Sequence, residues 1–123
     1  MHTDQLTLPD GLVGLPALTR FTIAPVDDGP LLELVSADQP DFGFLVMAGE
    51  IVRPGLGALL VGRGLAAPDE DVLVLLSIHG DPPAVTANLA GPIVIAVDGR
   101  SARQLVVEDP SLPLRAPVDP AAS

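Results

Sequence analysis

Proline and glycine together supply 26 of the 123 residues and divide the chain into short segments. Proline interrupts the interior of helices, and glycine is the usual residue of tight turns. The longest apolar run between them, residues 72–78, has the length of a strand. A membrane-spanning helix needs about 20 consecutive apolar residues. We therefore expect short strands joined by turns, and neither a long helix nor a membrane span.

Several segments have the alternating or β-favouring composition that is typical of strands. The run 72–78 is a continuous β-rich run in which only Ser77 is polar, which indicates a central strand buried on both faces. Segments 31–36 and 42–47 flank a turn-like sequence and are predicted to pair as a hairpin. A second hairpin is predicted around Asp98-Gly99, because this dipeptide tolerates the positive φ angles of a tight turn. The predicted strands are residues 3–8, 20–24, 31–36, 42–47, 72–78, 93–97 and 103–107.

These features predict an all-β fold, a small antiparallel barrel-like or sandwich domain of about seven short strands with at most one short helix. The expected helix would occupy residues 58–61, next to a loop-like stretch at residues 53–57. We expect a single β domain over residues 1–110. Residues 111–123 are Pro-rich and are expected to form an extended C-terminal tail that is frayed at its end.

Composition excludes several classes of function. The chain has no cysteine, which removes disulfides, thiolate metal sites and thiol nucleophiles. Sixteen acidic residues against six basic ones, all of them arginine, give a net charge of −10. Such a charge repels phosphate backbones, so we expect no direct binding of nucleic acid. The N-terminus lacks the basic and apolar regions of a secretory signal, and we expect a cytoplasmic protein that is not bound to a membrane.

No group of residues has the pattern of a catalytic or metal site. Residues 57–64 have the glycine spacing of a phosphate-binding loop, but Arg63 and Gly64 replace its Lys and its Ser or Thr. His79 and Asp81 are close in sequence, and we interpret them as a solvated turn. The acidic clusters at residues 27–28 and 69–71 lack the spacing of a calcium loop. We therefore expect a non-enzymatic protein without a metal or cofactor.

The most unusual stretch is residues 85–95, where Thr86 and Asn88 interrupt an apolar sequence just before a predicted strand. Such side chains can hydrogen-bond to nearby backbone groups and tie an irregular connection onto a sheet. Pro92 fixes the entry to the next strand. On physical grounds the stretch is a structural corner.

At this stretch the sequence resembles the flagellar assembly factor FliW family. The resemblance rests on Asp71-Val72-Leu73-Val74-Leu75, Thr86-Ala87-Asn88-Leu89-Ala90-Gly91-Pro92-Ile93-Val94-Ile95, Gln104-Leu105-Val106-Val107 and a tail near Arg115, in that order. Weaker matches in the N-terminal half are residues 12–15, Phe21, residues 34–36 with Pro40, and residues 44–46. The Gly-rich residues 53–67 stand where the family has an acidic, Tyr-containing loop and short helix, so a partner contact there would differ.

The resemblance implies a barrel-like cytoplasmic protein that binds flagellin and the carbon storage regulator CsrA, and so relieves the repression of flagellin translation by CsrA. Its candidate partner-binding residues are Arg115, Asn88 and Thr86, although a structural role is the simpler interpretation of Asn88 and Thr86. The alternative is a divergent small β-barrel that acts only as a structural or ligand-binding module, with residues 57–64 contributing to a pocket.

Overall fold

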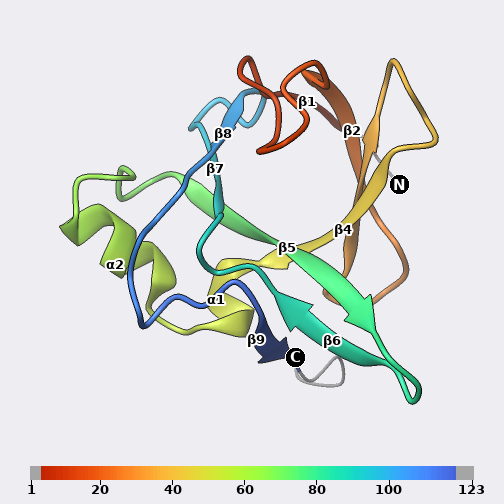
Figure 1. Cartoon of the computed structure of the whole chain (residues 1–123). Coiled ribbons are helices and arrows are strands. Elements are labelled where there is room, and N and C mark those ends of the chain that lie inside the picture. The colour runs from red at the N-terminus through yellow and green to blue at the C-terminus, as the bar shows by residue number, and fades with distance from the viewer. Residues whose placement is uncertain (1–3, 119–123) are drawn as a thin grey trace.

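The computed structural model describes residues 4–118, in which nine strands form one antiparallel sheet and two short helices lie beside it (Figure 1). The strands are β1 (Asp4–Thr7), β2 (Arg20–Pro25), β3 (Leu32–Ser36), β4 (Gly43–Ala48), β5 (Asp71–His79), β6 (Ala84–Ala87), β7 (Ile93–Ile95), β8 (Ala102–Gln104) and β9 (Ala116–Val118). The helices are α1 (Gly49–Val52) and α2 (Leu56–Gly62).

Seven of the strands form a nearly closed barrel. Strands β1 to β5 pair in chain order, and the first half of β5 then pairs with β7, which pairs with β8. The ring returns to β1 through a single bridge between Thr7 and Ser101, where the Thr7 N–H donates to the Arg100 carbonyl at 2.7 Å. The second half of β5 pairs with β6, and β9 continues the sheet outside the ring. This arrangement confirms the predicted fold class.

Strands β4, β5 and β7 each separate two apolar cores. Along β5, Leu73 points into the barrel, whereas Val74 and Leu76 point to the other face, because successive side chains of a strand alternate. Inside the barrel are Leu6, Leu8, Leu12, Leu18, Phe21, Leu34, Val46, Leu73, Ile93 and Ala102. On the other face are Met47, Leu56, Leu60, Val74, Leu76, Ala87, Leu89, Val94, Val107, Leu112 and Ala116. The expected burial on both faces is thus confirmed for residues 72–76, whereas Ser77 and Ile78 are exposed at the end of the run that extends beyond the barrel.

Residues 49–62 differ from the expectation, because they form two short helices where at most one was expected. The predicted residues 58–61 lie within α2, and α1 precedes it. Leu56 and Leu60 are four residues apart, so both lie on one face of α2 and are fully buried in the second core. The carboxylate of Glu50 in α1 accepts hydrogen bonds from the Gly55 and Gly57 amides at the start of α2. Burial of Leu56 and Leu60 thus stabilises helix in a Gly-rich sequence.

Both predicted hairpins are confirmed, and two strands were missed. The turn between β7 and β8 has Gly99 at φ 71°, and the carboxylate of Asp98 accepts hydrogen bonds from the Arg100 and Ser101 amides. The hairpin strands end sooner than predicted, at Ile95 and Gln104. The two missed strands are β6 and β9, whose four and three residues are too few to show an alternating pattern of polar and apolar side chains. No helix within residues 4–118 is long and apolar enough to cross a membrane.

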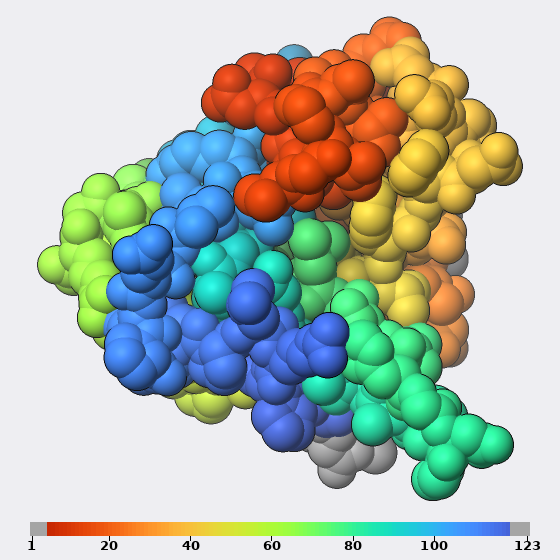
Figure 2. Space-filling model, viewed as in Figure 1, coloured from red at the N-terminus to blue at the C-terminus, as the bar shows by residue number. Residues whose placement is uncertain are grey.

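The C-terminal segment contributes to the second core. Leu112 and Ala116 are buried there, and β9 pairs with β6 through the register Ala87 to Ala116 and Val85 to Val118. In Figure 2, the same segment covers part of the face turned to the viewer. The expected fraying concerns the end of the tail, and residues 119–123 lie outside the described residues.

Phe21 offers a test of the barrel core, because it is 1% exposed and is the largest fully buried side chain inside the barrel. Phe21→Ala is expected to lower the free energy of unfolding by about 3–5 kcal/mol, since it removes packing and leaves a cavity. Phe42→Ala is the matched control: Phe42 is 39% exposed, and its loss should cost less than about 1 kcal/mol. Chemical denaturation measures both values. Equal losses would show that the barrel interior is not the main core.

Candidate partner-binding surface

The corner between β6 and β7 is an interruption in the strand that pairs with β5. Ala87 pairs with Leu76 and Ile93 pairs with Leu73, so residues 88–92 lie opposite only residues 74–75. Asn88 holds this extra length in place. Its N–H donates to the Leu75 carbonyl at 2.9 Å, and its Oδ1 accepts from the Gly91 amide at 2.9 Å. The expected bond from Asn88 to nearby backbone is therefore present.

Gln104 ties the corner to the N-terminal loop. Its Nε2 donates to the Gly91 carbonyl at 3.0 Å, and its Oε1 accepts from the Val13 amide at 2.7 Å. The two amide side chains leave no room at Gly91, where an added Cβ would lie 2.7 Å from Asn88 Nδ2 and 2.9 Å from Gln104 Nε2. The glycine is required here by close approach. Gln104 was not identified from the sequence as part of this corner.

The C-terminal segment passes the corner twice. On the first pass, the Leu105 N–H donates to the Pro92 carbonyl and the Val107 N–H to the Ala90 carbonyl, both at 2.8 Å. On the second pass, the Leu89 N–H donates to the Pro113 carbonyl at 3.0 Å, just before β9 pairs with β6. The backbone of residues 88–92 is therefore bonded on both sides, as a structural corner requires.

Asp109 fixes the turn between these two passes. Its Oδ1 accepts hydrogen bonds from the Ser111 N–H at 2.8 Å and from the Ser111 hydroxyl at 2.9 Å. Its Oδ2 forms an ion pair with Arg63, which follows α2, and the Asp109 side chain is only 8% exposed. These bonds to Ser111, together with the charges of Arg63 and Arg53, lower the pKa of Asp109. The spacing Asp-x-Ser in a Pro-rich stretch is the sequence feature that could have indicated this turn.

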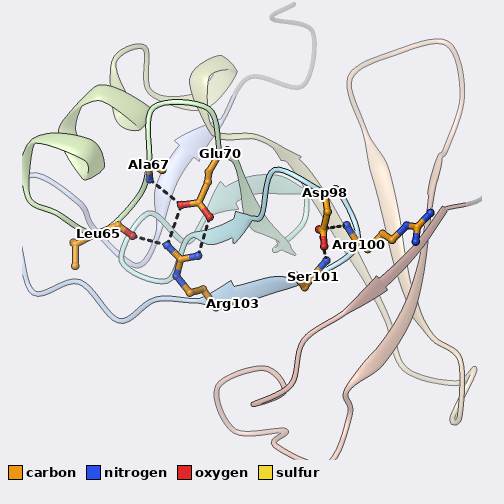
Figure 3. A network of polar contacts seen from close by, with 7 residues as sticks. All are labelled: Leu65, Ala67, Glu70, Asp98, Arg100, Ser101 and Arg103. Atoms are coloured by element: carbon orange, nitrogen blue, oxygen red, sulfur yellow. Dashed lines mark hydrogen bonds and ion pairs between the residues drawn. The ribbon is translucent and has the colours of Figure 1, made fainter.

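A second charged contact holds the chain after α2 against β8 (Figure 3). Arg103 donates from Nη1 to Glu70 Oε2 at 3.1 Å, and from Nη2 to Glu70 Oε1 at 3.2 Å and to the Leu65 carbonyl at 2.9 Å. Glu70 Oε1 also accepts from the Ala67 amide at 2.8 Å. The Arg103 guanidinium, and then the Ala67 amide, lower the pKa of Glu70. The carboxylate cluster at residues 69–71 thus contains one residue with a structural role.

The structure brings the three candidate partner-binding residues together: Thr86 lies in β6, Asn88 directly follows β6, and Arg115 directly precedes β9. Ala87 pairs with Ala116, so the same register extended by one residue sets Asn88 opposite Arg115. Arg115 is exposed, as is the adjacent Leu114. Thr86 is half-buried, and its Oγ1 lies 3.2 Å from His79 Nε2 on the neighbouring strand β5. The three residues form a small surface, at whose edge Arg115 lies beside the exposed Leu114. Within residues 4–118, Arg115 forms no ion pair with a carboxylate.

Residues 57–64 and His79, which the sequence analysis considered for phosphate and metal binding, have structural neighbours in the fold. Residues 57–64 form most of α2 and its C-terminal turn. The nearest polar partner of the His79 ring is Thr86. Within residues 4–118, no three His, Asp or Glu side chains are grouped so that they could hold a metal ion.

Comparison with known proteins finds one family and one fold. A model of the family described as FliW protein matches residues 1–118. The chain is 31% identical to the flagellar assembly factor FliW of Bdellovibrio bacteriovorus, over 94% of this chain and 70% of that protein. It is 32% identical to the flagellar assembly factor FliW of Treponema pallidum, over 83% of this chain and 72% of that protein.

The fold is also similar to a solved structure. The crystal structure of a flagellar assembly factor FliW superposes with a TM-score of 0.73 at 22% sequence identity, and covers 91% of this chain and 83% of that chain. At this identity the match concerns the arrangement of the strands. It shows the likeness of the two folds alone.

Asn88 gives a test of the corner. Asn88→Leu removes the acceptor for the Gly91 amide, which leaves a donor unpaired in a half-buried site and should lower the free energy of unfolding by about 1–3 kcal/mol. Asn88→Asp keeps an acceptor oxygen and should lose less. Thermal and chemical denaturation measure both. A stable Asn88→Leu protein that no longer binds its partner would show instead that Asn88 acts mainly in recognition.

Asp109 gives a test against pH. Because its pKa is lower in the folded protein, the carboxylate contributes stability at pH values above its ordinary pKa of about 3.9, and this contribution is lost as the pH falls through the folded value. Asp109→Asn should therefore be less stable than the parent protein at pH 6, and the difference should narrow toward pH 3. Denaturation curves across this range measure it. A difference that stays constant with pH would rule out this role of the charge.

Proposed function

The chain belongs to the FliW family of flagellar assembly factors, and from this premise we propose that it binds flagellin and the translational regulator CsrA. By binding CsrA, the protein relieves the repression of flagellin translation. The family is non-enzymatic, so binding is the whole of the activity. The observation that carries the proposal is the family match over residues 1–118, which includes both the barrel and the C-terminal segment.

The charge of the chain supports the choice of CsrA. A protein that binds RNA presents a basic surface, and this chain carries a net charge of −10. Three of its six arginines, Arg20, Arg63 and Arg103, are paired with carboxylates of the chain itself. The remaining surface therefore attracts a basic partner over a distance set by ionic strength. We place this encounter in the cytoplasm, where translation takes place.

The surface proposed for partner binding consists of Arg115, Asn88 and Thr86. Arg115 is exposed and lies beside the exposed Leu114, and such a pair offers a partner one charged and one apolar contact. Asn88 and Thr86 also stabilise the corner behind it, so their contribution to binding is proposed to be the smaller one. The proposal treats residues 1–110 as the β domain and residues 111–123 as a C-terminal tail, in which Leu112 and Ala116 anchor the segment in the second core and Arg115 is exposed.

The alternative, a divergent barrel that binds a ligand, is favoured by one observation. Gly57 of α2 lines two hollows at the surface, so the Gly-rich segment does contribute to a pocket. This observation does not compete with partner binding, since none of the residues that line these hollows belongs to β6, β9 or the C-terminal segment.

Calorimetry against purified CsrA and purified flagellin tests the proposal directly. The parent protein should give a heat of binding and co-elute with each partner at micromolar concentration. Arg115→Glu should weaken at least one of the two interactions about tenfold, equivalent to about 1.4 kcal/mol, with no loss of thermal stability. Arg100→Glu is the control, because Arg100 is exposed at the β7–β8 turn, away from β9. If neither partner gives heat or co-elution, the proposed function fails.

A further inference from the structure

One end of the barrel is open and leads into a groove along α2. The first hollow, of about 470 Å³, lies at the barrel end and is called the mouth hollow; its lining includes Leu6, Ile23, Leu32, Leu73 and Ile95. The second, of about 530 Å³, lies against α2 and is called the helix hollow; its lining includes Ala58, Val61, Ala67 and Pro68. Both volumes are typical of binding sites.

The two hollows adjoin each other and share three lining residues. Glu50, Gly57 and Glu70 line both of them, so the groove passes from one to the other between two carboxylates and over a residue without a side chain. A Cβ placed at Gly57 would meet only Glu50 Oε2, at 3.7 Å. The groove therefore has space above Gly57, and a larger side chain there would block it.

The mouth hollow is apolar because it exposes the edge of the barrel core. Ile23, Leu32 and Ile95 pack against that core and remain partly exposed at its open end. Leu6 and Leu73 are buried beneath them. Apolar surface that stays in contact with water is a source of binding free energy for a ligand that covers it.

The charged side chains along the groove are acidic. Its charged lining residues are Glu50, Glu70 and Asp71, and none of the residues that line either hollow is basic. Glu70 is neutralised by Arg103, whose guanidinium binds both of its oxygens. Glu50 accepts two backbone hydrogen bonds, which leave its negative charge uncompensated. Asp71 is exposed at the start of β5, where it pairs in register with Ile95 at the barrel end.

We propose that this groove binds an extended peptide segment in which one Arg or Lys stands between two aliphatic side chains. The aliphatic side chains occupy the two hollows, and the cation lies between them against Glu50 and Asp71. In an extended chain, side chains two residues apart point to the same side, so the pattern is aliphatic-x-basic-x-aliphatic. The charge selects the cation, and the two apolar hollows select its neighbours. The site does not depend on the surface around Arg115.

A synthetic peptide of sequence Leu-Ser-Arg-Ser-Leu, with both ends blocked, tests the site in the full-length protein. Titration of the isotope-labelled protein, followed by amide chemical shifts, is expected to move the resonances of residues that line the two hollows. The same peptide with Glu in place of Arg should bind at least about tenfold more weakly, the size expected for exchanging an attractive charge for a repulsive one. Replacing either Leu with Ser should also weaken binding.

Two pairs of variants give matched controls. Gly57→Phe fills the groove and should abolish the shifts, whereas Gly57→Ala leaves most of the space open, should bind as the parent does and should be at least as stable, since Ala favours helix over Gly by about 1 kcal/mol. Asp71→Arg reverses a charge at the mouth and should weaken binding about tenfold. Asp69→Arg reverses an exposed charge two residues away that does not line the groove, and should have little effect beyond long-range attraction.

Several results would overturn the assignment. The first is the absence of shifts at millimolar peptide, and the second is shifts confined to residues around Arg115. Equal binding of the Arg and Glu peptides would remove the role of the carboxylates. Binding of decyltrimethylammonium without binding of the peptide would indicate a site for small lipophilic cations instead. Protein that self-associates through these residues, seen as a concentration-dependent mass in sedimentation, would identify a second copy as the occupant. None of these outcomes would affect the calorimetry with CsrA and flagellin.

Discussion

The two-sided burial of β5 is the constraint on which the rest of the structure depends. Leu73 lies inside the barrel and Val74 and Leu76 lie in the second core, so one strand supports both. The strand is nine residues long, and no single neighbour covers its whole length on the side away from β4. Its two halves therefore pair with different strands, β7 in the barrel and β6 outside it. The corner between β6 and β7 follows directly from this division.

The corner in turn positions the surface that we propose for partner binding. Residues 88–92 lie opposite only two residues of β5, so the sheet cannot pair all of their backbone groups. Burying these groups without hydrogen bonds would cost free energy. Asn88, Gln104 and the two passes of the C-terminal segment supply the missing bonds. Because the returning segment must come back to pair beside β6, it brings Arg115 next to the corner. The candidate surface thus results from the hydrogen bonds that the backbone of residues 88–92 requires.

Sequence patterns predicted the strands and turns whose structure depends on residues close to one another in the chain. The run 72–78 and the Asp98-Gly99 turn identified the central strand and the last hairpin, because apolar continuity and a permissive turn act over a few residues. Strands β6 and β9 could not be predicted in this way, since three or four residues become a strand only when a distant edge pairs with them. Asn88 was identified as a structural residue, whereas Gln104 and Asp109 were missed because their partners are set by the tertiary fold.

The distribution of charged residues affects both the stability of the fold and the kind of molecule that the protein can bind. Arg63 pairs with Asp109 and Arg103 pairs with Glu70, so these two ion pairs hold both ends of the segment that follows α2. These ion pairs neutralise two of the few positive charges of the chain, which has six arginines and no lysine. The carboxylates left over, among them Glu50 and Asp71, face solvent without a cation from the described chain within ion-pair distance. Their complement has to come from the molecule that binds, which makes a basic group in the ligand a requirement of the proposed groove.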